Sequence, residues 1–294
     1  MENYKPHWTT SSKKLSPAQR RRVIANTRRA QYTIGRRMRN AMRRFFSGQA
    51  QRVVDAWLEA DGILSWDQGG DYKSVASQLV GPREDDLIVA ASRPYVVELT
   101  VSGLNTAAAM TGAEGIVATS PVVLMLADIS AQRVVLVNNA TRRAIQRAVT
   151  RGSSAGYSAF EIANGSTATR KVGFRPLKSI VGPPYLYKRR PDCIARTELA
   201  YSNNGAVLHG LAESGFNDVE VADGPGCALT HHAGKRPGET TPEDINGRII
   251  TMSQANLYQL AHPNCRRVFL STVGRRRSGT PKPQPVESFS TPAR

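Results

Sequence analysis

Apolar residues recur every three or four positions near the N-terminal end of the chain. They are Ala30, Ile34, Met38, Met42, Phe45, Phe46, Val53 and Trp57. This spacing places them on one side of an α-helix, so it predicts a single long amphipathic helix. Ser16 is a typical N-cap, with Pro17 at the first helical position and Gln19 three residues after the cap. Asp61 and Gly62 predict the end of this helix.

The central part of the chain alternates helical patterns with helix breakers. Residues 63–83 hold two Gly-containing breaker pairs and predict a loop or short linker. Residues 84–111 are apolar and rich in alanine, but Pro94 is expected to interrupt any helix there. A further helix is expected over residues 130–151, with Gly152 as its stop.

Two further helix starts lie beyond this region. Ser158 and Glu161 form a second capping box, which predicts a short helix that ends before Asn164. A loop rich in Gly, Pro and Lys follows, and residues 191–215 then predict a long helix. The chain finishes with a short irregular part. This order predicts a mainly α protein, with a multi-helix N-terminal and central region and a small α+β C-terminal subdomain.

Positive charge is concentrated at the N-terminal end. The formal net charge is +17, and residues 1–52 carry +13 of it, from fourteen Lys or Arg and a single acid, Glu2. The arginines on the polar faces of the first predicted helix are Arg20, Arg21, Arg22, Arg28, Arg29, Arg36, Arg37, Arg39, Arg43 and Arg44. Such a density predicts sequence-independent contacts with DNA phosphates, or contacts with an acidic partner protein. The alternative is an ordinary solvated face on a packing helix.

The cysteine content and the apolar stretches indicate the compartment of the protein and the kind of polyanion that it meets. The three cysteines are few and odd in number, which speaks against a disulfide framework and favours a reducing compartment. The N-terminus lacks the apolar core of a signal peptide, and the most apolar stretch, residues 116–127, is too short to span a bilayer. We therefore expect nucleic acid, and no membrane, as the polyanion. Residues 271–294 are rich in Pro, Ser and Thr and predict a disordered basic tail.

Cysteine and histidine gather in two short clusters near the C-terminal end. Cys227 precedes His231 and His232, and His262 precedes Cys265. Thiolate and imidazole suit tetrahedral zinc, and two short ligand pairs separated by a long loop are the usual arrangement of a structural site. The pattern therefore predicts a structural zinc site. The alternative is that the cysteines are small buried apolar residues.

The same region resembles a known family. Ile-Ala-Arg-Thr-Glu at 194–198, an Asp-then-Cys turn, Gly247 and His-Pro-Asn-Cys-Arg at 262–266 are together similar to the core motifs of the Mu F-like minor head proteins of tailed phages. The closing pair of arginines followed by an aromatic residue resembles the variants from phages of actinobacterial hosts. The motif residues with an implied structural role are Arg196, Thr197, Glu198, Asp223, Pro263, Asn264 and Arg266. Many relatives carry a second cysteine where this chain has Arg267.

The resemblance implies a minor capsid protein that acts in head morphogenesis. Such a protein lies inside the head of the virion at the portal vertex, and in the host cytoplasm during assembly. Its implied partners are the portal protein, a capsid or scaffold protein and the backbone of the phage DNA, and its implied roles are head assembly and genome packaging or ejection. The expected divisions are a basic N-terminal helical arm (1–62), a helical region with loops (63–128), the minor head domain (129–270) and the tail (271–294).

We expect no enzymatic activity. The alternative is a metal-dependent nuclease of the His-metal type, or another DNA-processing enzyme. A His-metal nuclease needs metal ligands at short spacing on a helix, and Pro263 directly after His262 disfavours a helix at that point. Neither the Glu-x-Glu motif of an ADP-ribosyltransferase nor a phosphate-binding Gly-x4-Gly-Lys-Ser/Thr loop occurs in the chain.

Overall fold

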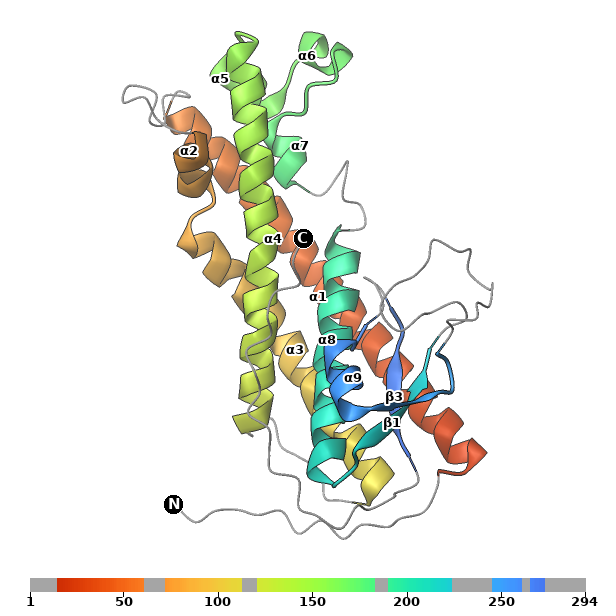
Figure 1. The fold of residues 1–294 in the computed structure, drawn as a ribbon. Coiled ribbons are helices and arrows are strands. Elements are labelled where there is room, and N and C mark those ends of the chain that lie inside the picture. The colour runs from red at the N-terminus through yellow and green to blue at the C-terminus, as the bar shows by residue number, and fades with distance from the viewer. Residues whose placement is uncertain are drawn as a thin grey trace.

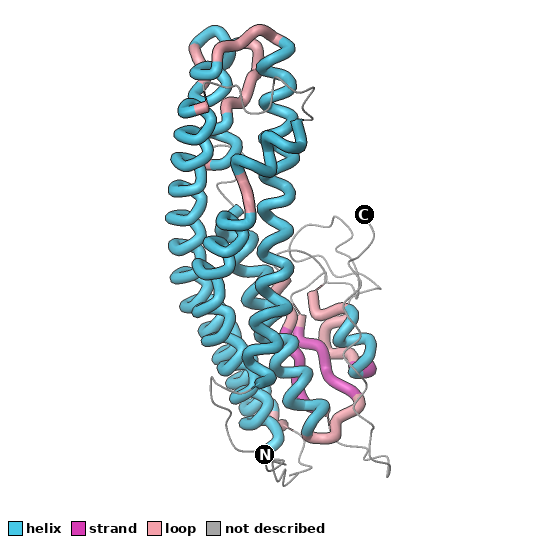
Figure 2. The backbone as a smooth tube through the Cα atoms, turned by 90° about the vertical axis from the view of Figure 1, so that its left-hand side faces the viewer, coloured by secondary structure: helices cyan, strands magenta, loops and turns pink. Residues whose placement is uncertain are grey.

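The fold is a helical bundle with a small sheet at one end (Figures 1 and 2). The computed structural model describes residues 15–60, 72–112, 121–182, 190–223, 245–260 and 265–272. The helices are α1 (Pro17–Glu59), α2 (Tyr72–Leu79), α3 (Pro82–Thr111), α4 (Pro121–Ser154), α5 (Ala159–Asn164), α6 (Thr167–Lys171), α7 (Leu177–Val181), α8 (Arg190–Glu213) and α9 (Met252–Leu257). The strands are β1 (Asp218–Ala222), β2 (Ile249–Thr251) and β3 (Val268–Ser271). The predicted class, mainly α with a small α+β C-terminal part, is confirmed.

Helix α1 begins at the predicted residue and belongs to the bundle over most of its length. The Ser16 hydroxyl accepts a hydrogen bond from the Gln19 N–H at 3.2 Å, and the Gln19 side chain accepts one from the Ser16 N–H at 2.8 Å. Met38 and Phe46 lie in a buried cluster with residues of α3, α4 and α8. Further along, Trp57 joins a second cluster and its indole N–H donates to the carbonyl of Ala159 at 3.0 Å. The basic N-terminal segment therefore shares its apolar side with the core.

Helix α3 runs without interruption past Pro94, so the predicted break there is wrong. Proline cannot donate to the carbonyl one turn earlier, which belongs to Ala90. Both Pro94 and Ala90 are exposed, so water reaches this carbonyl. On the opposite side Ile88, Val96 and Leu99 are buried in the core, and their packing outweighs the local cost of proline, about 3 kcal/mol.

Helix α4 is longer at both ends than residues 130–151. It starts at Pro121, a favoured residue for the first helical position, and Val123 and Ala127 extend its buried stripe toward the N-terminal end. Gly152 does not stop the helix. It is buried, and an added Cβ would lie 2.6 Å from Cγ1 of Ile162, so this glycine permits close contact with α5.

The remaining helices include some that the sequence patterns missed. Helix α5 forms behind the predicted capping box of Ser158 and Glu161. The segments expected as loops contain α2, α6 and α7. The apolar residues of α2 and α7 join the cluster around Trp57. Figure 1 shows α5, α6 and α7 together at the end of the bundle far from the sheet.

Helix α8 is the central helix of the bundle and carries the sheet. It starts and ends where the sequence predicts, and it contacts α1, α3 and α4. Helices α3 and α8 approach closely at Gly103, where an added Cβ would lie 2.7 Å from the Asn203 carbonyl oxygen. The sheet has the order β2-β1-β3 and is antiparallel throughout. Its buried residues share a cluster with Val207, Leu208 and Leu211 of α8.

Helices α3 and α4 would be long and apolar enough to cross a membrane, judged only by length and composition. Core helices of soluble bundles meet the same criterion. In this structure α3 packs chiefly against α8, α1 and α4, and α4 packs chiefly against α3, α2 and α8.

Candidate functional site

The most distinctive surface of the described structure lies along α1. Seven of the ten arginines singled out from the sequence are exposed and have no ion pair with another described residue. We call this surface the arginine face, and it consists of Arg21, Arg22, Arg28, Arg29, Arg36, Arg43 and Arg44. At 3.6 residues per turn, these positions fall within an arc of roughly 160° over a length of about 35 Å. The buried residues of the same stretch, such as Ile34, Met38 and Phe45, lie on the opposite side.

The other three arginines form ion pairs with acids of neighbouring elements. Arg20 forms an ion pair with Glu220 of β1. Arg37 pairs with Glu98 of α3 at 2.9 Å and lies over the ring of Tyr95, 5.5 Å from its centroid. A third pair joins Arg39 to Asp192 of α8, also at 2.9 Å. These side chains therefore have a structural role that the sequence pattern alone did not separate from the arginine face.

The electrostatics of the arginine face are one-sided. The first acidic residue of α1 is Asp55, more than two helical turns beyond Arg44. A face that served solubility alone would intersperse both signs, because neighbouring like charges repel. Guanidinium groups bind phosphate or carboxylate oxygens through paired N–H donors. The arginine face can therefore bind an extended polyanion.

A second polar site pins the C-terminal subdomain. Arg267 donates from Nε and Nη2 to the carboxylate of Asp223, with Nη2 at 2.8 Å from Oδ2, and both side chains are completely buried. Its Nη1 donates to the carbonyl of Tyr258 at 2.6 Å. The Asn204 side chain of α8 donates to the carbonyls of Gln259 and Arg267. This network joins the end of β1, the start of β3 and α8.

Arg267 is the site residue that sequence reasoning missed. It stood out only as a departure from the cysteine of similar proteins, and it is one of forty basic residues. Asp223, which the family resemblance selected, is now seen as its partner. The only local signal is an arginine directly before the apolar strand β3, and such a position gives no indication of a distant carboxylate.

Glu198 of the Arg-Thr-Glu motif joins α8 to α4. Its carboxylate accepts hydrogen bonds from Arg133 at 3.0 Å and Ser130 at 3.1 Å, and Arg133 lies 4.6 Å from the ring centroid of Tyr201. Burial raises the pKa of Glu198, and the charge and hydrogen bond of Arg133 oppose that rise. Arg196 is exposed, as is Arg266, whereas Thr197 is half-buried with its hydroxyl 4.0 Å from Sγ of Cys193.

Most of the predicted zinc ligands lie outside the described residues. This holds for Cys227, His231, His232 and His262, and also for the motif residues Pro263 and Asn264. Cys265 is buried in an apolar cluster with Ala200 and Leu260, and Tyr201 packs against it. Within the described ranges, no three or more His, Cys, Asp or Glu side chains are grouped to hold a metal ion. The zinc site remains a prediction.

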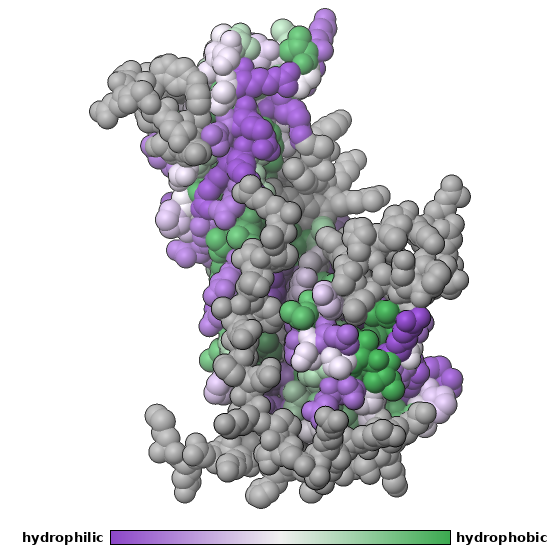
Figure 3. Space-filling model, viewed as in Figure 1, coloured by the Kyte–Doolittle hydropathy of each residue, from purple (hydrophilic) through white to green (hydrophobic). Residues whose placement is uncertain are grey.

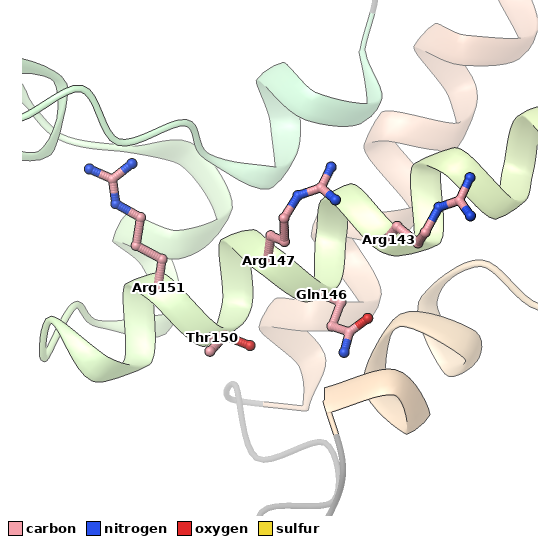
Figure 4. Close-up of a pocket in the computed structure, with 5 residues that line it drawn as sticks. All are labelled: Arg143, Gln146, Arg147, Thr150 and Arg151. Atoms are coloured by element: carbon pink, nitrogen blue, oxygen red, sulfur yellow. The ribbon is translucent and has the colours of Figure 1, made fainter. Parts of the chain in front are cut away.

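A shallow pocket lies on the outer side of α4 (Figure 4). It is lined by Arg143, Gln146, Arg147, Thr150 and Arg151. The three arginines are exposed and the two neutral residues are half-buried. None of these residues is among the predicted site residues, although the three arginines recur at i, i+4 and i+8 of a predicted helix.

Comparison with known proteins found no match for this chain. No family model matches the chain, and no curated protein or solved structure matches it either.

Proposed function

We propose that this chain is a structural minor head protein of a tailed bacteriophage, and that its arginine face contacts the backbone of the phage DNA. In this proposal it is attached at the portal vertex inside the capsid and acts in head assembly and in genome packaging or ejection. The observation that carries the DNA contact is the arginine face on α1. The placement in a phage head rests on the resemblance of the motifs at 194–198 and 262–266.

The geometry of the arginine face favours a nucleic acid backbone as its partner. A length of about 35 Å corresponds to roughly ten base pairs of duplex DNA at 3.4 Å each. Arginine offers planar, paired donors that match phosphate oxygens. The seven arginines outnumber the other exposed polar or aromatic side chains in the same arc, which include Asn26, Tyr32 and Asn40. Binding through such a surface is independent of sequence and falls steeply with salt.

The partners of the motif residues support a structural role. The Glu198 carboxylate is engaged by Arg133 and Ser130, and the Asp223 carboxylate by Arg267. Each network connects different elements, which is what a packing motif does. A nuclease would instead need carboxylates or histidines gathered around a metal ion and open to substrate.

The test compares the full-length protein with a variant in which all seven arginines of the arginine face are changed to glutamine. Binding of a fluorescein-labelled 30-base-pair duplex of random sequence is measured by anisotropy at several KCl concentrations. We expect the slope of log K against log salt to shrink by up to about 6, because each lost phosphate contact contributes about 0.9. Far-UV circular dichroism checks that the variant keeps its fold.

Two results would contradict the proposal. If the variant binds DNA normally but no longer binds isolated portal rings, the arginine face serves the portal protein and the DNA contact is wrong. If the protein is absent from purified virions and the isolated chain cleaves DNA when a divalent metal is added, the nuclease alternative replaces the structural role. A few copies in each virion, together with salt-sensitive DNA binding, are the expected results.

A further inference from the structure

The outer side of α4 carries a second basic surface, separate from the arginine face. Arg143, Arg147 and Arg151 follow one another at intervals of four residues, and all three are exposed. Figure 4 shows their side chains extending to the same side of the helix, while Gln146 and Thr150 occupy the adjacent strip. We call the three arginines the α4 ladder. Successive members lie about 6 Å apart along the helix axis.

The α4 ladder is not balanced by acids. Neighbouring Arg142 is turned the other way, and its Nη2 pairs with Asp85 at 2.7 Å. In contrast, Arg143 and Arg147 have no ion pair or hydrogen bond with any other described residue. Arg151 uses one Nη2 donor on the carbonyl of Val172, at 3.2 Å, which leaves its other donors for a ligand.

The short helix α6 adds charge at the same place. The contact between Arg151 and the Val172 carbonyl sets the end of α6 beside the α4 ladder. Its last turn holds Arg170 and Lys171, and both are exposed. Helix α6 therefore adds positive charge next to the Arg151 end of the α4 ladder. The shallow pocket itself is lined by α4, and its two neutral residues, Gln146 and Thr150, are able to donate hydrogen bonds.

From this arrangement we infer that the α4 ladder, with Gln146 and Thr150, is a second site for the phosphate backbone of a nucleic acid. Arginine together with neutral amide and hydroxyl donors is the usual set of groups that contact phosphate oxygens. The ladder spans about 12 Å, or between three and four nucleotides of one strand. An acidic protein segment is the other possible polyanion, and the neutral donors with the high net charge of the chain, +17, favour nucleic acid.

The two basic surfaces lie toward opposite ends of the bundle. The first arginines of the arginine face are beside the sheet, as the ion pair of Arg20 with Glu220 shows. The α4 ladder is near α5, α6 and α7, at the other end (Figures 1 and 3). Figure 3 shows hydrophilic residues gathered over that half of α4. The two surfaces can therefore bind separate segments of a nucleic acid. This inference extends the DNA contact proposed above but rests on different residues.

The test uses the full-length variant Arg143→Gln, Arg147→Gln, Arg151→Gln and a control with the same net charge. The control is Arg83→Gln, Arg196→Gln, Arg266→Gln, because these three arginines are exposed but spread over separate elements. Both proteins are titrated with the labelled 30-base-pair duplex from about 50 to about 300 mM KCl. Over this range the affinity of a protein that makes several phosphate contacts falls by roughly 10³-fold or more. Thermal melting confirms equal folding.

We expect the salt slope to fall by about 2 to 3 in the ladder variant, from three lost phosphate contacts, and to stay close to the wild-type slope in the control. Equal slopes in the two variants would overturn the inference, since net charge alone would then account for binding. If the ladder variant keeps the wild-type salt slope for DNA but no longer binds polyglutamate, the α4 ladder binds an acidic protein segment and the inference is overturned. If the variant of the arginine face binds DNA normally while the ladder variant does not, the proposed DNA contact of α1 fails and the α4 site stands.

Discussion

The buried ion pair between Asp223 and Arg267 allows a quantitative prediction. Both side chains are fully buried and meet through three N–O contacts of 2.8 to 3.1 Å. Changing Asp223 to asparagine keeps the shape but turns an amide N–H2 toward the Arg267 donors and leaves a buried cation without a counter-charge. Removing one partner of such a pair costs about 3–5 kcal/mol of unfolding free energy.

A double-mutant cycle separates the interaction free energy of the Asp223–Arg267 pair from the other effects of each substitution. Arg267→Met keeps most of the apolar stem and leaves Asp223 as the buried charge. The double variant Asp223→Asn, Arg267→Met has no buried charge, so its destabilisation should be smaller than the sum of the two single changes by about 2–3 kcal/mol. The half-buried, solvent-accessible pair of Arg20 and Glu220 is the control, and Glu220→Gln should cost less than about 1 kcal/mol.

Two assays report the result at different scales. Urea unfolding followed by far-UV circular dichroism gives the global free energy. Hydrogen exchange of the β1 and β3 amides gives the free energy of local opening of the sheet. Because about 1.36 kcal/mol corresponds to a factor of ten, a loss of about 3 kcal/mol lowers the protection factor by about 150-fold. If each single variant loses less than about 1 kcal/mol, or if the double variant equals the sum, then the ion pair does not pin the subdomain and our reasoning is wrong.

The helix starts were predictable because their signals are local. The capping boxes at Ser16 and Ser158 involve residues three positions apart, so the sequence contains the whole interaction. Pro94 and Gly152 misled the prediction because their effect depends on the other side of the helix. Pro94 faces water while the opposite side is buried, and Gly152 is required by the contact with Ile162. Neither fact is visible in the local pattern.

In the candidate sites too, features set by local sequence were predictable and features set by distant residues were not. The charge of α1 and its apolar stripe are periodic, so the sequence indicated a basic helix face correctly. It did not indicate which arginines form ion pairs, since Glu98 and Asp192 are far from Arg37 and Arg39 along the chain. Asp223 and Arg267 are forty-four positions apart, and no periodic pattern in the sequence predicts that they pair. Pairings of this kind follow from the tertiary fold alone.

Three further predictions test separate parts of the structure. Gly35→Ala should raise the unfolding free energy by up to about 1 kcal/mol, because the new Cβ would meet Leu199 Cδ1 at an ordinary 3.6 Å. Gly152→Ala should lower the unfolding free energy by about 1–3 kcal/mol, because the new Cβ would clash with Ile162. The urea midpoints of the two variants and the wild type give this comparison. For the predicted zinc site, elemental analysis of protein purified without chelator should find roughly one zinc per chain, lost in a Cys227→Ser, Cys265→Ser variant, and a metal-free wild-type protein would contradict it. The last prediction concerns His209, whose pKa is lowered from its usual 6.5 because burial disfavours the imidazolium, with Glu213 opposing. The folded state therefore binds a proton more weakly than the unfolded state, so the stability linked to this group is present above pH 6.5 and is lost as the pH falls through the folded pKa. His209→Gln cannot take up this proton, and its unfolding free energy should decline less than that of the wild type between pH values of about 7.5 and 5; equal declines would show that His209 is not the group responsible.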